Sequence, residues 1–230
     1  MAAELGIPVV GEAFFGSATE EIEPLSFPFP RLTDEQFLAM ARVPGVVGVK
    51  EYFGVIPGIG DLNLEMFTAR VNNPDACTDD LLTSITQQFG ENQPLALQWL
   101  RELSNAMQTY PWDSSWYSRL IGTADPDHGW NAAFIRGQQV ETPSWESTRR
   151  AHFMMTEDKQ PHPFFLEDIH LRIEICIQHI DAALSAGETL ARQVTTPPYQ
   201  AMIQKAQYDI RKFRQVALSY ALHLRETNVA

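Results

Sequence analysis

The chain has 230 residues, of which 44% are hydrophobic and 20% are charged, and this composition is typical of a folded globular protein. Acidic side chains outnumber basic ones by 29 to 17, which gives a formal net charge of −12. This charge argues against nonspecific binding of nucleic acid and against docking on an anionic membrane surface, because both require a basic face. No apolar stretch reaches the roughly 18 residues of a membrane span, so none is expected.

The cysteines and the N-terminal residues bear on the compartment. Cys77 and Cys176 are the only cysteines, and they lie far apart with no C-x-x-C spacing. This pattern favours two thiols in a reducing compartment over a disulfide framework or a zinc site. The N-terminal residues lack the basic region and the long apolar region of a signal peptide. We therefore expect a cytoplasmic protein.

The N-terminal quarter of the chain has the pattern of a strand, a helix and a second strand. The near-continuous apolar run at 7–15 is typical of a strand buried on both faces, as in parallel sheets. Thr33 and Gln36 have the spacing of a capping box for a helix that ends before Pro44. Residues 46–53 are the second predicted strand. This order predicts a βαβ unit with two parallel strands.

From Asp61 onward the spacing of apolar residues predicts three successive helices. Thr78 is the expected cap of the second helix, and Gly90 is its expected end. Pro94 begins the third helix, which ends near Tyr110.

The second half of the chain divides into an irregular stretch and a helical one. Residues 111–163 hold four of the five tryptophans together with Pro, Gly and Asp, a composition that predicts a joint between units or a functional loop. Beyond it, apolar residues at alternating steps of three and four predict two helices of about 25 residues each. The segment 195–198 separates them, so we expect an antiparallel helical hairpin.

The expected fold class is therefore α/β to mainly α. We divide the chain into an α/β segment at 1–75, a helical segment at 76–122, a tryptophan-rich irregular linker at 123–163 and a helical hairpin at 164–230.

Two glutamates stand near the ends of the predicted strands, Glu12 in the first and Glu51 in the second. Ligands of parallel α/β sheets bind beyond the carboxyl ends of the strands. We therefore take Glu12 and Glu51 as candidate catalytic residues, acting as acid and base or as acid and nucleophile in glycoside hydrolysis. The alternative is that each carboxylate makes a cap or an ion pair at the rim of the sheet.

Four further residues are candidate contacts to a sugar. Glu23 lies in an acidic loop after the first strand, and Lys50 and Tyr52 flank the end of the second. Trp130 lies beside acidic residues in the tryptophan-rich stretch, and its flat apolar face suits sugar stacking. The alternatives are a solvated acidic loop and tryptophans that pack the helical part onto the α/β part.

Other chemistries find little support in the sequence, so neither a metal nor a cofactor is expected. The glycine-rich turn at 54–60 lacks a phosphate-binding motif, and Asp61 after it would repel a phosphate. Glu167 and His170 have the E-x-x-H spacing of half a di-iron site, but the second helix of the hairpin lacks the other half. No motif for a serine or cysteine nucleophile is present.

Five segments carry a family resemblance, and they read GEAFFGSATEEIEPLSFPFPRL, GVVGVKEYFG, GDLNLEMFTAR, TDDLLTSITQQFG and LALQWLRELSNAMQTYPW. Together they resemble the last part of a bacterial glycoside hydrolase of the (β/α)8-barrel type, over roughly residues 6–122. In such enzymes the terminal barrel strand ends in a glycine-rich turn, and a helix with a D/N-x-N-L-E signature follows. The C-terminal hairpin resembles the helical domain appended to these barrels.

The resemblance implies a partial barrel segment, since the chain offers about two strands where a closed barrel of this type needs about eight. The chain would then be the C-terminal part of a carbohydrate-active enzyme whose parent reaction is hydrolysis of a glycosidic bond by a carboxylate pair. Alone it would be inactive or weak, and its partners would be a carbohydrate substrate and either the missing N-terminal part or further copies of the chain. The alternative is a non-enzymatic module that binds or dimerises through exposed stripes of the helical hairpin.

Overall fold

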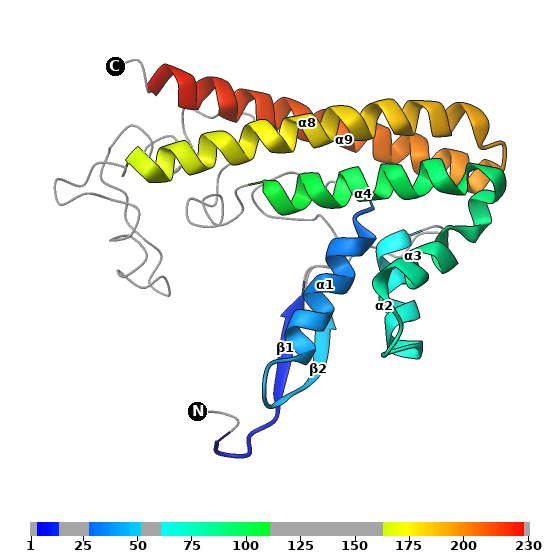
Figure 1. Cartoon of the computed structure of the whole chain (residues 1–230), viewed down its shortest axis with the longest axis vertical. Coiled ribbons are helices and arrows are strands. Elements are labelled where there is room, and N and C mark those ends of the chain that lie inside the picture. The colour runs from blue at the N-terminus through cyan, green and yellow to red at the C-terminus, as the bar shows by residue number, and fades with distance from the viewer. Residues whose placement is uncertain (1–3, 14–27, 52–60, 111–162, 228–230) are drawn as a thin grey trace.

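The computed structural model describes residues 4–13, 28–51, 61–110 and 163–227 (Figure 1). In this part of the chain two parallel strands are followed by a mainly helical body, which confirms the coarse fold class predicted above. The elements, in chain order, are β1 (Val9–Ala13), α1 (Pro30–Ala41), β2 (Val46–Glu51), α2 (Leu62–Asn72), α3 (Thr78–Thr86), the 3-10 helix η1 (Gln87–Asn92), α4 (Gln93–Thr109), α8 (Pro163–Gln193) and α9 (Pro197–Thr227).

The two strands pair in parallel, and α1 connects them and packs against them. A Cβ atom added at Gly11 of β1 would lie 3.1 Å from the Met40 Sδ atom, so α1 covers this face of the sheet closely. A Cβ added at Gly48 would meet no atom of the described residues within 4 Å. Val10, paired with Gly48, is 58% exposed. The described part of the chain thus leaves the second face of the sheet uncovered.

The start of α1 differs from the predicted capping box. The helix begins at Pro30, and Phe29 is its cap residue. Thr33 lies inside the first turn, where its hydroxyl donates to the Phe29 carbonyl oxygen over 3.4 Å. The prediction was wrong because proline fits the first helical position, where its missing N–H is not needed.

The prediction that Thr78 caps a helix, here α3, is also wrong. Cys77 is the cap residue of α3, and the Thr78 hydroxyl donates instead to the Asp34 carboxylate over 2.6 Å. The α-helix ends at Thr86, one turn before Gly90, whose φ of 56° marks a kink within η1. The Thr78 hydroxyl, which the local pattern assigned to a helix cap, therefore makes a long-range hydrogen bond to Asp34 instead.

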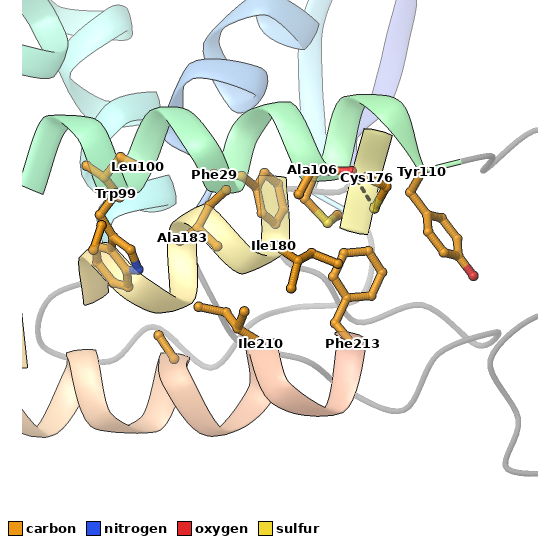
Figure 2. Close-up of a cluster of buried hydrophobic side chains, with 14 of the residues drawn as sticks. Phe29, Trp99, Leu100, Ala106, Tyr110, Cys176, Ile180, Ala183, Ile210 and Phe213 are labelled. Carbon is orange, nitrogen blue, oxygen red and sulfur yellow. Dashed lines mark hydrogen bonds between the residues drawn. The ribbon is translucent and has the colours of Figure 1, made fainter. Parts of the chain in front are cut away.

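Helices α4, α8 and α9 lie side by side and form the larger apolar core (Figure 1). Figure 2 shows Ala106 of α4 facing Cys176 of α8, with Trp99 at the other end of the cluster and Phe213 of α9 beneath. The two predicted stripes are buried to within 1% exposure throughout their central positions; these are Ile169, Ile173, Cys176, Ile180 and Ala183 in α8, and Ile203, Ala206, Ile210, Phe213 and Ala217 in α9.

This burial corrects the expectation that the stripes are exposed and available to another chain. Helix α4 and Phe29 cover them within the same molecule, so the apolar surface is already removed from water. The hydrophobic effect scales with the apolar area removed from water, so the stripes already stabilise the fold as part of its core. A binding module that uses these stripes is therefore not supported.

Ion pairs on the outer side join α8 to α9. Arg211 contacts Glu188 over 3.1 Å, and Arg225 contacts Glu174 over 2.9 Å. Residues farther along α9 thus meet residues earlier in α8. Exposed pairs of this kind add little stability, so the apolar stripe holds the two helices together and the charges set their register.

A buried ion pair joins α1, α2 and the start of α3. Arg70 and Asp34 are 2% and 0% exposed, and two hydrogen bonds of 2.6 and 2.8 Å link the guanidinium to the carboxylate. The Arg70 Nη1 atom also donates to the carbonyl oxygens of Pro74 and Ala76, over 2.9 and 2.7 Å. Burial raises the pKa of Asp34, but the hydrogen bonds from Arg70 and Thr78 outweigh it, and the net pKa lies below the ordinary value of 3.8.

We predict that Asp34→Asn lowers the free energy of unfolding by about 3–5 kcal/mol, because it leaves the Arg70 charge buried without its counter-ion. Urea unfolding followed by circular dichroism measures this loss. The matched control is Asp168→Asn, which removes one exposed carboxylate 3.5 Å from Arg172 and should stay within about 0.5 kcal/mol of the unchanged chain.

The pH dependence of the two proteins separates the ion pair from a packing effect. Since the folded pKa of Asp34 is lowered, this residue adds stability above the unfolded value of 3.8, and the added stability is lost as the pH falls through the folded pKa. Asp34→Asn should therefore lose less stability than the unchanged chain on acidification below about pH 4. Equal losses in the two proteins would contradict this account of the ion pair.

Candidate functional site

The parallel register brings three predicted site residues to one edge of the sheet. Glu12 pairs with Lys50, and Ala13 pairs with Glu51, at the carboxyl ends of both strands. This edge is where parallel α/β sheets bind ligands, since the loops that follow the strands gather there. The side chains of Glu12 and Glu51 lie outside what the structure describes. Glu23, Tyr52 and Trp130 lie wholly outside the described residues.

The pleat of the strands distinguishes the two glutamate positions. Successive residues of a strand alternate between faces, and paired residues of neighbouring strands share one. By this alternation the Glu12 and Lys50 positions belong to the same face as Val10, which is uncovered. The Glu51 position belongs to the face of Gly11, which meets α1. The register thus favours Glu12 with Lys50, rather than the two glutamates, as neighbours on the uncovered face. Glu51 is the last residue of β2 and pairs with Ala13.

The D-x-N-L-E sequence at 61–65 forms the start of α2 and connects it to the start of α1. The Asp61 carboxylate accepts hydrogen bonds of 3.1 Å from the backbone N–H groups of Asn63 and Leu64, and so caps α2. The Asn63 Oδ1 atom accepts from the Phe29 N–H over 2.7 Å, which ties the start of α2 to the start of α1. Both residues thus hold backbone in place, which is a structural role that the motif alone did not reveal.

Glu65, the last residue of this motif, is a titratable group that the sequence reasoning missed. Burial raises its pKa above the ordinary 4.5, a hydrogen bond from Gln88 opposes the rise, and the Asp61 charge adds to it. The Gln88 Nε2 atom lies 3.4 Å from the Glu65 carboxylate. The sequence could have pointed to Glu65 through its position. It lies in the first turn of the helix that follows a candidate site strand, and the helix dipole favours an acidic side chain there.

His170, one of the two residues of the half di-iron spacing, makes an ordinary polar contact on α8. His170 lies 3.0 Å from Glu174, which also pairs with Arg225, and this arginine lowers the pKa of Glu174. Within the described ranges, no three side chains of His, Cys, Asp or Glu gather closely enough to hold a metal ion. The glycine-rich turn at 54–60 falls outside those ranges, and no described helix is long and apolar enough to cross a membrane.

The two cysteines occupy opposite environments. Cys77 is exposed at the start of α3, whereas Cys176 is buried in the α4–α8 interface. The Cys176 Sγ atom donates to the Ala106 carbonyl oxygen over 3.3 Å (Figure 2). Burial raises the pKa of the Cys176 thiol to about 12, which suppresses the reactive thiolate.

We predict that one thiol per native chain reacts with dithiobis-nitrobenzoate near neutral pH and that both react after denaturation, because only Cys77 is accessible. The absorbance of the released thiolate measures both stages. Cys77→Ser should abolish the fast native reaction, and Cys176→Ser should preserve it. A fast native reaction that survives in Cys77→Ser would contradict the burial of Cys176.

Comparison with models of known protein families, with curated proteins and with solved structures finds no match to this chain.

Proposed function

We propose that this chain is a C-terminal segment of a carbohydrate-active hydrolase whose parent reaction cleaves a glycosidic bond with a pair of carboxylates. The observation that carries the proposal is the parallel register, in which Glu12, Lys50 and Glu51 stand together at the carboxyl edge of β1 and β2. Sites of parallel α/β enzymes are built at this edge. In the same proposal Glu23, Tyr52 and Trp130 contact the sugar.

The uncovered face that the two-stranded sheet has among the described residues supports the same proposal. Parallel sheets occur almost only with both faces covered, and a pair of strands alone is marginal in water. Val10 is nevertheless 58% exposed among the described residues. We propose that further strands from the rest of the enzyme cover this face and extend the partial barrel. In this proposal the activity of the chain alone is low, because those further strands supply part of the shell that positions the site.

The roles of the two carboxylates follow from their neighbours along the strands. Glu12 stands opposite Lys50, and a nearby ammonium stabilises the ionised form of a carboxylate. We therefore assign Glu12 as the base or nucleophile. Glu51, at the final position of β2, is the proposed acid.

The helical body completes the proposed architecture. We propose that α8 and α9 form an antiparallel hairpin appended to the barrel segment, which the pairs Arg211–Glu188 and Arg225–Glu174 support. A cytoplasmic location belongs to the same proposal, and the two free cysteines support it.

We predict slow hydrolysis of one or more nitrophenyl glycosides by the purified chain, with kcat/KM lowered about 100-fold or more in Glu12→Gln, because general acid–base catalysis contributes at least this factor. Glu51→Gln should show a loss of similar size. Release of nitrophenol, measured across a panel of α- and β-linked sugars, follows the reaction. The matched control is Glu35→Gln, an exposed position of α1 at which the rate should not change.

Circular dichroism establishes that each variant is folded before its rate is compared. A chain that hydrolyses the glycosides equally well with Glu12→Gln and Glu51→Gln would overturn the assignment of the carboxylates. A folded chain that hydrolyses none of the panel would overturn the proposal of residual activity in this segment.

A further inference from the structure

A cavity lies away from the strand edge, between α1, α3 and α4. It has a volume of about 440 Å³, within the range of roughly 300–1,000 Å³ typical of small-molecule sites. The residues that line it are Arg31 from α1, Asp79, Leu82 and Thr83 from α3, and Pro94, Leu97, Gln98, Leu100 and Arg101 from α4. None of them belongs to the site proposed at the carboxyl edge.

The floor of this cleft is apolar and well supported. Leu82 and Leu100 are only 6% and 1% exposed, so their positions are fixed by packing. Leu82 belongs to the small apolar cluster beneath α2 and α3, and Leu97 packs against that cluster. Leu100 belongs to the larger core of α4, α8 and α9. The cleft therefore lies at the seam between the two cores, and ligand pockets favour such junctions.

Two guanidinium groups stand at the walls of the same cleft. Arg31 forms an ion pair with Asp79, which holds it across the gap between α1 and α3. The Arg101 side chain is 59% exposed, and its Nε atom lies 3.5 Å from the carboxylate of Glu102, the adjacent residue on the same helix. The Arg101 side chain keeps this exposure despite the contact with Glu102, so part of its guanidinium is accessible from solvent to an anion.

We propose that this cleft binds a small organic monoanion with an apolar body, such as an aryl- or alkyl-carboxylate. The carboxylate pairs with Arg101 and with the outer edge of Arg31, because guanidinium groups bind carboxylates through paired hydrogen bonds. The apolar body covers Leu82, Leu97 and Leu100. Asp79 repels a second negative charge, which restricts the ligand to a single one. This proposal is independent of the hydrolase proposal.

The test uses the full chain with 4-phenylbutyrate and its neutral counterpart 4-phenylbutanol as probes, measured by isothermal titration calorimetry. Saturable one-to-one binding of the acid is expected, with the alcohol about tenfold weaker or more, because the alcohol loses the charge-assisted hydrogen bonds. Arg101→Gln should weaken the acid about tenfold and leave the alcohol unchanged. Gln98→Glu, a change of nearly equal shape that adds a negative charge to the cleft, should also weaken the acid.

Arg192→Gln is the matched control, because Arg192 is an exposed arginine near the end of α8 and outside the cleft. It should bind both probes as the unchanged chain does. Absence of saturable binding by the acid, equal affinity for acid and alcohol, or unchanged binding in Arg101→Gln would each overturn the proposal. Because these readouts do not involve glycoside hydrolysis, their failure is distinct from failure of the proposed function.

Discussion

The buried ion pair between Asp34 and Arg70 fixes the relation between the strands and the helices. Its carboxylate lies on α1, its guanidinium on α2, and the Thr78 hydroxyl of α3 completes it. Pairs of this kind contribute little net energy compared with a well-packed apolar replacement, but removal of one partner is severe. The orientation of α1 is therefore specified by charge and hydrogen-bond geometry. Since α1 also covers one face of β1 and β2, the edge that carries Glu12 is held by the same interaction.

The larger apolar core has a different role. Helices α4, α8 and α9 bury their stripes against one another, and their cluster holds most of the buried apolar residues in the described part of the chain. Helix α4 also contacts α1 and α3, so it connects this core to the polar junction around Asp34. Helix α4 thus packs into the apolar core on one side and contacts the helices joined by the ion pair on the other. The cleft with Arg31 and Arg101 lies between α4 and two of these helices, α1 and α3.

Elements whose signals are local could be predicted from the sequence. The apolar run of β1, the positions of β2 and α2, and the three-four spacing of α8 and α9 depend on neighbouring residues and on side-chain period. The true helix caps could not be predicted at Thr33 and Thr78. Helix α1 begins at Pro30, three residues before Thr33, and the Thr78 hydroxyl donates to the carboxylate of Asp34, 44 positions away. Long-range pairing of this kind leaves no mark on local spacing.

The candidate site divides in the same way. That Glu12 and Glu51 reach one edge follows from the predicted parallel order of the strands. Their relative pleat positions depend on the irregularity between Val9 and Val10, which shifts the pairing by one residue. A shift of one residue exchanges the two faces of a strand, so the sequence could not predict which neighbour shares a face with Glu12.

The central claim is that the carboxyl edge of β1 and β2 meets a sugar, and a titration of the isotope-labelled chain with methyl α- and β-glycosides, followed by nuclear magnetic resonance, tests it most directly. The account predicts saturable shifts of the backbone amide signals of Glu12, Lys50 and their strand neighbours, with the signals of Arg211 and Arg225 on α9 unmoved. Unchanged strand signals at saturating sugar, or shifts confined to α8 and α9, would contradict it.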